Sequence, residues 1–196
     1  MLKRQIFAFA ILLIAAPVGA KTGNRCGTYP EGVDAFSDCI LREAGEKALW
    51  RGSLPRGVIQ VIRFTFTEGH LAYTKVIDLT ERANGKATIR LQTFRRERDG
   101  HRSLMEQRNH RLSTEELTTI DLLGSSSGTW EHRIGSWDGD EIFMHCETLD
   151  MERATRTTYS FASVSISCNQ PKKLMPLVHF ITGLVSLRPY ADRQMF

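Results

Sequence analysis

Apolar and polar residues alternate from Val58 to Thr67 and again from Leu71 to Leu79, and this period of two constrains the fold more than any other feature; two further runs follow at Thr88–Arg96 and Ser103–Arg111. Such alternation is typical of β-strands that bury one face. Turn signals separate the runs at Glu68–His70, Asn84–Gly85 and Asp99–Gly100. Because Asn-Gly suits the positive φ angles of a type I′ turn, we predict a tight hairpin there. Consecutive strands joined by short turns predict a four-strand antiparallel meander over residues 58–111.

Three segments outside the meander have the spacing of amphipathic helices. Apolar residues recur every three or four positions within Val33–Trp50 and again within residues 171–188. In residues 112–124, Ser113 and Glu116 have the spacing of a capping box at the start of a helix. The glycine that closes this range and the serines after it are expected to end that helix.

A second β unit is predicted over residues 140–168, with a polar turn around Asp150–Arg156. After that turn apolar residues alternate strictly with serines, which predicts one dry face and one wet face. The order of elements is helix, four strands, helix, two strands, helix. We therefore predict an α+β fold, an antiparallel β-meander sheet with helices packed on one face, in a single domain over residues 21–196. Residues 21–57 form its lead-in and first helix.

The first twenty residues have the three parts of a secretory signal peptide. Lys3 and Arg4 form a positive start, Ile6–Ala16 is apolar, and Pro17–Ala20 ends in small residues. The apolar run is shorter than the roughly 20 residues that a membrane-spanning helix needs. We predict cleavage near Ala20, a mature chain without a transmembrane segment, and a periplasmic or extracellular location.

The charge of the mature chain is small. The full 196-residue chain has a formal net charge of +4, and loss of Lys3 and Arg4 leaves +2. This low net charge and the predicted location outside the cytoplasm disfavour nucleic acid as a partner.

All four cysteines lie in the mature part, and in an oxidising compartment an even number predicts two disulfides. Three connectivities are open. We favour Cys26–Cys39 with Cys146–Cys168, because each pair is close in sequence. A metal site is the alternative, but only His145 and Cys146 are adjacent, and neighbours on a strand point to opposite faces.

The segment from Trp130 to Glu147 is the richest in side chains that could do chemistry. One hypothesis makes His145 an acid or base oriented by Glu141 or Glu147, since strand spacing puts the three on one face. Trp137 would contribute to a ligand wall. The alternative is that the carboxylates are solvent-facing strand residues.

Arginines concentrate around the predicted Asp99–Gly100 turn. A functional interpretation is an anion-facing patch for lipid headgroups, envelope glycans or an acidic protein, because the planar guanidinium suits carboxylate and phosphate. The alternative is a solvated hairpin with cross-strand ion pairs, each of small energy. The candidate binding residues are Arg95, Arg96, Arg98, Arg102 and Arg108.

No motif for a nucleophile, a phosphate loop, a zinc protease or a dinucleotide is present, so no cofactor or metal is predicted. The order of elements from Val58 to Leu187 resembles that of small secreted bacterial proteins of uncharacterised function. This resemblance implies an α+β fold and no particular activity.

The sequence thus favours an exported, non-catalytic binding protein that recognises a protein or an anionic envelope component. The alternatives are a hydrolytic or metal-assisted enzyme centred on His145, and a structural component of the envelope.

Overall fold

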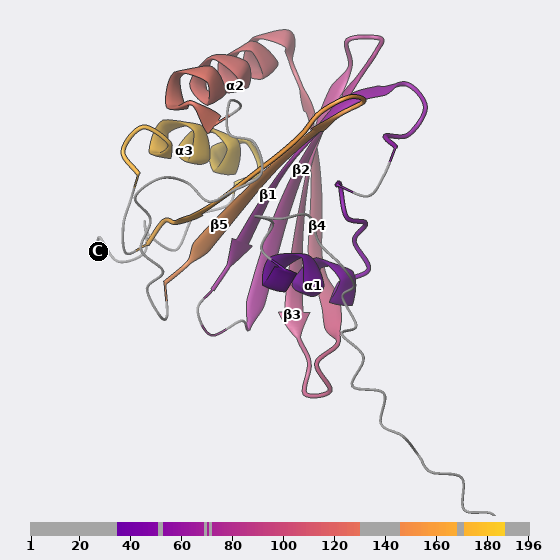
Figure 1. Cartoon of the computed structure of the whole chain (residues 1–196), viewed down its shortest axis with the longest axis vertical. Coiled ribbons are helices and arrows are strands. Elements are labelled where there is room, and N and C mark those ends of the chain that lie inside the picture. Colours follow the sequence, from indigo (N-terminus) through magenta and orange to yellow (C-terminus); the bar gives the residue numbers. More distant parts are fainter. Residues whose placement is uncertain are drawn as a thin grey trace, which may run out of the picture.

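Six strands pair into one antiparallel sheet with the order β4-β3-β2-β1-β5-β6 (Figure 1). The computed structural model describes residues 35–50, 53–68, 70, 72–129, 146–167 and 171–186. The strands are β1 (Val58–Thr67), β2 (Tyr73–Arg82), β3 (Ala87–Arg96), β4 (Arg102–Leu112), β5 (Thr148–Thr155) and β6 (Tyr159–Ser165). The helices are α1 (Ala35–Glu43), α2 (Thr114–Ser127) and α3 (Met175–Leu184). The predicted α+β class and the meander β1–β4 are confirmed.

The predicted hairpin at Asn84–Gly85 is confirmed, but its turn is not of type I′. The amide of Arg82 donates to the Lys86 carbonyl over 2.9 Å, and the Gly85 amide donates back to Arg82 over 2.9 Å. Gly85 has a φ of +74°, whereas Asn84 does not have a positive φ. The loop therefore has three residues and ends in a left-handed glycine. The β3–β4 loop repeats the arrangement with Gly100 at φ +84°.

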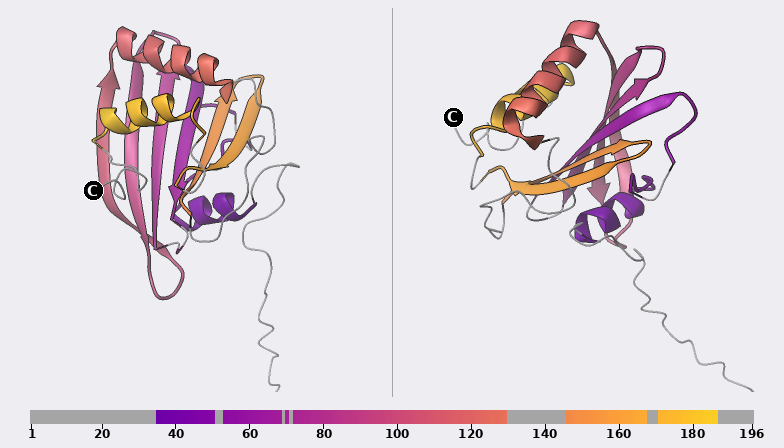
Figure 2. Two further views of the ribbon diagram at one scale, coloured as in Figure 1. Left: turned by 90° about the vertical axis from the view of Figure 1, so that its left-hand side faces the viewer. Right: turned by 45° about the horizontal axis from the view of Figure 1, so that its top comes forward.

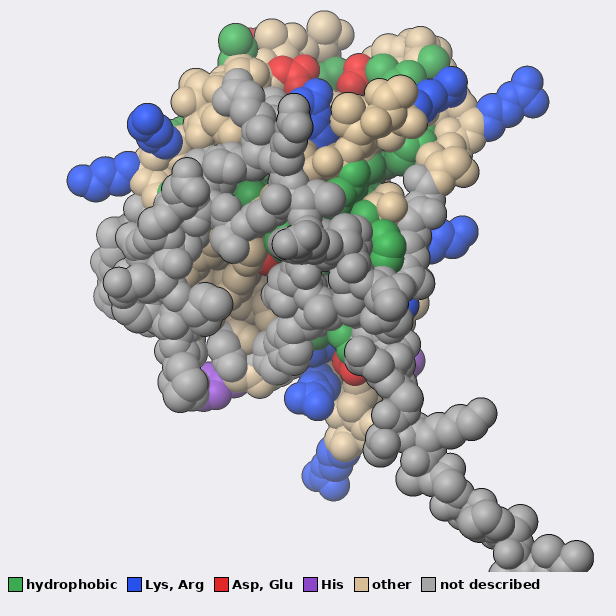
Figure 3. Space-filling model, viewed as in Figure 1, with side chains coloured by type: hydrophobic (Ala, Val, Ile, Leu, Met, Phe, Trp, Pro, Cys, Tyr) green, Lys and Arg blue, Asp and Glu red, His purple; other side chains and the backbone are tan. Residues whose placement is uncertain are grey.

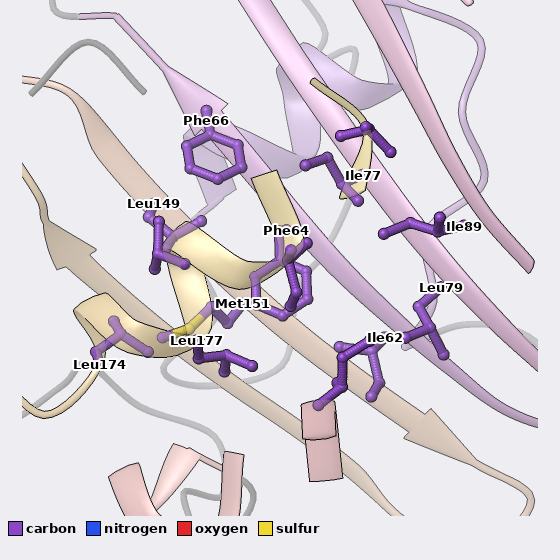
Figure 4. Packing of buried hydrophobic residues seen from close by; sticks show 14 of the residues in the cluster. Ile62, Phe64, Phe66, Ile77, Leu79, Ile89, Leu149, Met151, Leu174 and Leu177 are labelled. Carbon is purple, nitrogen blue, oxygen red and sulfur yellow. The ribbon is translucent and has the colours of Figure 1, made fainter. Parts of the chain in front are cut away.

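One face of the sheet carries the main hydrophobic core, and α2 and α3 lie side by side across it (Figure 2). Ile62 and Phe64 of β1 are at most 1% exposed, and the predicted stripe of the last helix meets them through Leu174 and Leu177 (Figure 4). Fully burying one such side chain is worth about 1.5–3 kcal/mol, so this face holds the two helices in place.

Helix α2 begins with the predicted capping box. The hydroxyl of Ser113 accepts a hydrogen bond from the Glu116 amide, and the Glu116 carboxylate accepts one from the Ser113 amide. The predicted end at Gly124 is wrong, since the helix continues to Ser127 and is closed by left-handed Gly128. The Ser127 hydroxyl donates to the Gly124 carbonyl over 2.9 Å, so the serine run extends the last turn instead of breaking it.

The predicted turn around Asp150–Arg156 is also wrong, because most of this segment forms β5. Leu149 and Met151 point into the main core, and Asp150 and Glu152 point to the opposite face, where they are only 2% and 6% exposed. Polar residues at buried positions therefore gave this strand the composition of a turn. The apolar side of β6 is confirmed, but the expected wet side of this unit is largely buried.

Helix α1 packs on the face of the sheet opposite α2 and α3, which corrects the prediction that all helices share one face. Leu41 contacts Val76 and Phe94, whose side chains point away from the main core. The helix ends at Glu43, well before Trp50. Gly45 adopts φ +78°, and the amides of Gly45 and Glu46 donate to the carbonyls of Arg42 and Leu41, which closes the helix.

Strand β4 forms one border of the sheet and pairs, among the described strands, only with β3. Thr93 faces Glu106 and Phe94 faces Leu104, so Met105 is an extra residue without a cross-strand partner. This β-bulge interrupts the regular ladder in the middle of the border strand.

Among the described residues, no helix combines the length and apolar character needed to cross a bilayer. The structure describes Cys39 and Cys146. Neither is a free thiol, and no disulfide joins these two. Cys26 and Cys168 lie outside the described residues, so the predicted pairing stays a prediction.

Candidate binding sites beside helix α1

The predicted acid–base site falls mostly outside the described residues. Glu141, His145 and Trp137 belong to the segment that the structure does not describe. Glu147 is described and is only 3% exposed, just before β5, where its amide donates to the Ser167 hydroxyl over 2.7 Å. The enzyme hypothesis therefore stays a prediction.

The five candidate arginines do not share one surface. Arg95 and Arg96 are neighbours on β3 and point to opposite faces. Arg95 pairs with Glu97 at 3.0 Å. Arg102 is only 3% exposed, donates to the Thr74 hydroxyl over 3.0 Å, and its burial lowers the pKa of the guanidinium. Arg98 is exposed in the loop.

Arg108 lies on the face of the sheet that carries α3. Its Nη1 donates to the Val185 carbonyl over 3.2 Å, and its Nε donates to Glu106 over 2.6 Å. A cation that binds the last carbonyls of a helix offsets the negative end of the helix dipole. Arg108 thus stabilises the end of α3 and is not grouped with the arginines at the end of the β3–β4 hairpin.

A cleft of about 560 Å³ lies between α1 and the end of the β3–β4 hairpin, and we call it the hairpin cleft. Blue Lys and Arg side chains project from the lower end of the molecule, where this hairpin ends (Figure 3). The residues that line the cleft are Cys39, Arg42, Glu43, Arg96, Asp99, Gly100 and His101.

The three-residue loop sets the position of His101. The Glu97 amide donates to the His101 carbonyl over 2.8 Å, and the His101 amide donates to the Asp99 carboxylate over 3.0 Å. A hydrogen bond from the Ser103 hydroxyl, together with Arg95, lowers the pKa of Glu97 and keeps this carboxylate ionised. The loop therefore presents His101 from a backbone that is held at both ends.

Two arginines and one histidine face two carboxylates in the hairpin cleft, and the buried Arg102 beside Glu43 adds a further positive charge. Glu43 lies 3.6 Å from the Nε of Arg102, and Asp99 already accepts a backbone hydrogen bond. Within the described part of the chain, no hydrogen bond or ion pair engages the side chains of Arg96 and His101. These two side chains and Arg42 make the cleft suited to an anion.

A second cleft of about 790 Å³, the deep cleft, lies between the chain that follows α1 and the adjacent face of the sheet. Four charged residues, Glu46, Arg63, Asp78 and Arg90, form what we call the floor cluster. The Nε of Arg63 donates to Asp78 over 2.7 Å, and its Nη1 donates to the Lys47 carbonyl over 2.9 Å. The Nη2 of Arg90 donates to Asp78 over 2.6 Å and to Glu46 over 3.1 Å.

Burial alone would raise the pKa of Asp78, but the charges and hydrogen bonds of Arg63 and Arg90 outweigh it and lower the pKa. Burial would also lower the pKa of Arg63, and Asp78, Glu152 and Glu46 together raise it above its ordinary value. Both groups of the central pair are therefore ionised over the whole physiological pH range.

The alternation in the sequence puts Arg63 on the polar side of its strand and does not connect it with Asp78. The register brings Arg63, Asp78 and Arg90 directly opposite one another on β1, β2 and β3. The sequence does contain an indication of this cluster, because Arg63, Asp78 and Arg90 are each a charged residue near the middle of a predicted strand. Arg42 is one of the polar residues between the apolar positions of the predicted first helix, a pattern that indicates only exposure to solvent, yet it lines both clefts.

Within the described ranges, no group of three or more His, Cys, Asp or Glu side chains could hold a metal ion. No family model and no curated protein matches this sequence.

Proposed function

We propose that this chain is an exported, non-catalytic binding protein whose hairpin cleft recognises a phosphate-bearing component of the cell envelope. The observation that carries the proposal is the convergence of Arg42, Arg96 and His101 on one cleft. Guanidinium groups bind phosphate oxygens through charge-assisted hydrogen bonds, which are about twice as strong as neutral ones. Such recognition needs shape and charge and no catalytic group.

Export and disulfides are part of the same proposal. The first twenty residues have the composition of a signal peptide, and the resemblance to small secreted bacterial proteins is in keeping with it. The contact of Glu147 with Ser167 supports a Cys146–Cys168 disulfide, because these residues are the sequence neighbours of the two cysteines. A Cys26–Cys39 disulfide would tie the segment before α1 to the wall of the hairpin cleft.

The test is binding of the mature protein to vesicles that contain phosphatidylglycerol, with phosphatidylcholine vesicles as the zwitterionic reference. Arg96→Gln is expected to weaken binding about fivefold at low salt, since each basic residue near an anionic surface contributes about 1 kcal/mol. Soluble glycerol phosphate, titrated separately, shows whether the headgroup alone suffices.

Arg82→Gln is the matched control. Arg82 is also an exposed arginine at the end of a strand beside a three-residue loop, and it does not line the hairpin cleft. It should leave binding unchanged. Equal losses for the two variants would indicate only non-specific charge attraction, and no loss for Arg96→Gln would remove the hairpin cleft from the proposal.

A further inference from the structure

The deep cleft has the size and composition of a small-molecule site. Its volume of about 790 Å³ falls within the range of roughly 300–1,000 Å³ that is usual for ligand pockets. One part of its lining is apolar and comes from the chain after α1 and from β1. These residues are Ala48, Leu49, Leu54, Pro55 and Val61.

The polar part of the lining is the floor cluster, and Arg90 is its accessible member. The Arg90 side chain is 36% exposed, whereas the side chains of Arg63 and Asp78 are 4% and 7% exposed. Only Nη2 of Arg90 is used by Asp78 and Glu46. Within the described residues, no hydrogen bond engages its Nε or Nη1, so two nitrogens of this guanidinium can still donate.

The charges around the deep cleft favour an anion over a cation. The floor cluster is balanced, with two arginines and two carboxylates. Arg42 and Lys47 also belong to the lining, whose only carboxylates are those of the floor cluster. The formal charge of the lining is therefore positive, which favours a carboxylate over an ammonium group at the two nitrogens of Arg90 that can still donate.

We propose that the deep cleft binds a small amphipathic carboxylate of the medium-chain fatty acid class. Its carboxylate accepts hydrogen bonds from Arg90, and its alkyl chain packs on Leu49, Leu54 and Val61. The buried Arg63–Asp78 pair holds Arg90 in place, so the cation is oriented before the ligand arrives. The two clefts share Arg42 in their linings, but this proposal does not depend on the function proposed for the hairpin cleft.

The test is titration of the mature protein with octanoate, followed by calorimetry and by amide chemical shifts. Acetate supplies the carboxylate without the chain, and octyl glucoside supplies the chain without the charge. We expect octanoate to bind at least about tenfold more tightly than either, because it alone uses both parts of the lining. Equal binding of octyl glucoside and octanoate would overturn the role of Arg90.

Arg90→Gln is expected to weaken octanoate binding about tenfold or more, since it removes a charge-assisted hydrogen bond. Leu54→Ser leaves the floor cluster intact and should lower affinity for octanoate without affecting the response to acetate. Arg111→Gln, an exposed arginine on β4 outside the cleft, is the matched control and should bind like the wild type.

Two further outcomes would overturn the proposal: no octanoate binding by the folded wild type, or undiminished binding by both cleft variants. Thermal unfolding of each variant identifies loss of structure, and Leu54→Ser keeps the test decisive if Arg90→Gln fails to fold. Arg96→Gln should not alter octanoate binding, and Arg90→Gln should not alter vesicle binding. The two proposals can therefore fail separately.

Discussion

Replacing Asp78 by Asn is expected to destabilise the protein by about 3 kcal/mol, because it leaves the buried Arg63 guanidinium without its carboxylate. Breaking a buried ion pair by removing one partner costs about 3–5 kcal/mol. The lower end applies here for two reasons. The Lys47 carbonyl still accepts from Arg63, and Glu46 remains 3.6 Å from the Nη2 of Arg63.

The complementary change, Arg63→Met, should be less harmful. Asp78 would keep its 2.6 Å contact with Arg90, so the buried carboxylate would still have a cationic partner. The double variant Arg63→Met with Asp78→Leu removes both charges of the Arg63–Asp78 pair and leaves the Glu46–Arg90 pair at 3.1 Å. It should regain most of the stability lost in Asp78→Asn, since a buried pair can often be replaced by apolar side chains at little cost.

The assay is urea unfolding at pH 7, followed by circular dichroism, for the wild type and the three variants. A loss below about 1 kcal/mol for Asp78→Asn would refute the reasoning, because that is the size expected of exposed ion pairs. A double variant less stable than Asp78→Asn would refute it too, since the charges themselves would then be stabilising.

The same pair predicts a pH dependence with a definite sign. The pKa of Asp78 is lower in the folded state than the ordinary value of about 3.9 that applies to the unfolded chain. Its contribution to stability is therefore present above about pH 4 and is lost as the pH falls through the folded pKa. The loss of stability below pH 4 should be shallower in Asp78→Asn than in the wild type.

Two further predictions concern single hydroxyl groups. Ser113→Ala should lower the free energy of unfolding by about 1 kcal/mol, because it removes the cap that accepts from the Glu116 amide; an unchanged urea midpoint would contradict this role. Thr65→Val should raise the free energy of unfolding by about 1 kcal/mol, because the Thr65 hydroxyl is buried and, within the described residues, has no hydrogen-bond partner. A loss of stability in Thr65→Val would mean that this hydroxyl is bonded in solution.

Strands β1, β2 and β3 could be predicted because alternate residues of each are buried in the main core, whereas β4 is mostly exposed and could be predicted only from the Asp99–Gly100 turn before it. Ile62 and Phe64 alternate with Arg63, and this pattern is visible in any short window of the sequence. Strand β5 was not predicted because the alternation of Leu149 and Met151 with Asp150 and Glu152 is short and passes directly into further charged and hydroxyl residues, which give residues 150–156 the composition of a polar turn.

The floor cluster could be predicted only from the register of β2 and β3, and that register depends on the length of the loop between these two strands. A two-residue turn at Asn84–Gly85 would have placed Leu91 opposite Asp78. The three-residue loop places Arg90 there instead, and a shift of one residue reverses the face of every side chain. Two-residue and three-residue loops with a glycine have similar sequences, so the partner of Asp78 could not be predicted from the turn residues alone.

The extra residue at Met105 has a consequence for the behaviour of the protein in concentrated solution. A regular border strand offers its free amides and carbonyls to another molecule, and repeated pairing of this kind leads to fibrils. The bulge at Met105 and the charged Glu106–Arg108 pair beside it interrupt the row of amides and carbonyls with which a second molecule would pair. Deleting Met105 would straighten the border and should make the protein prone to self-association.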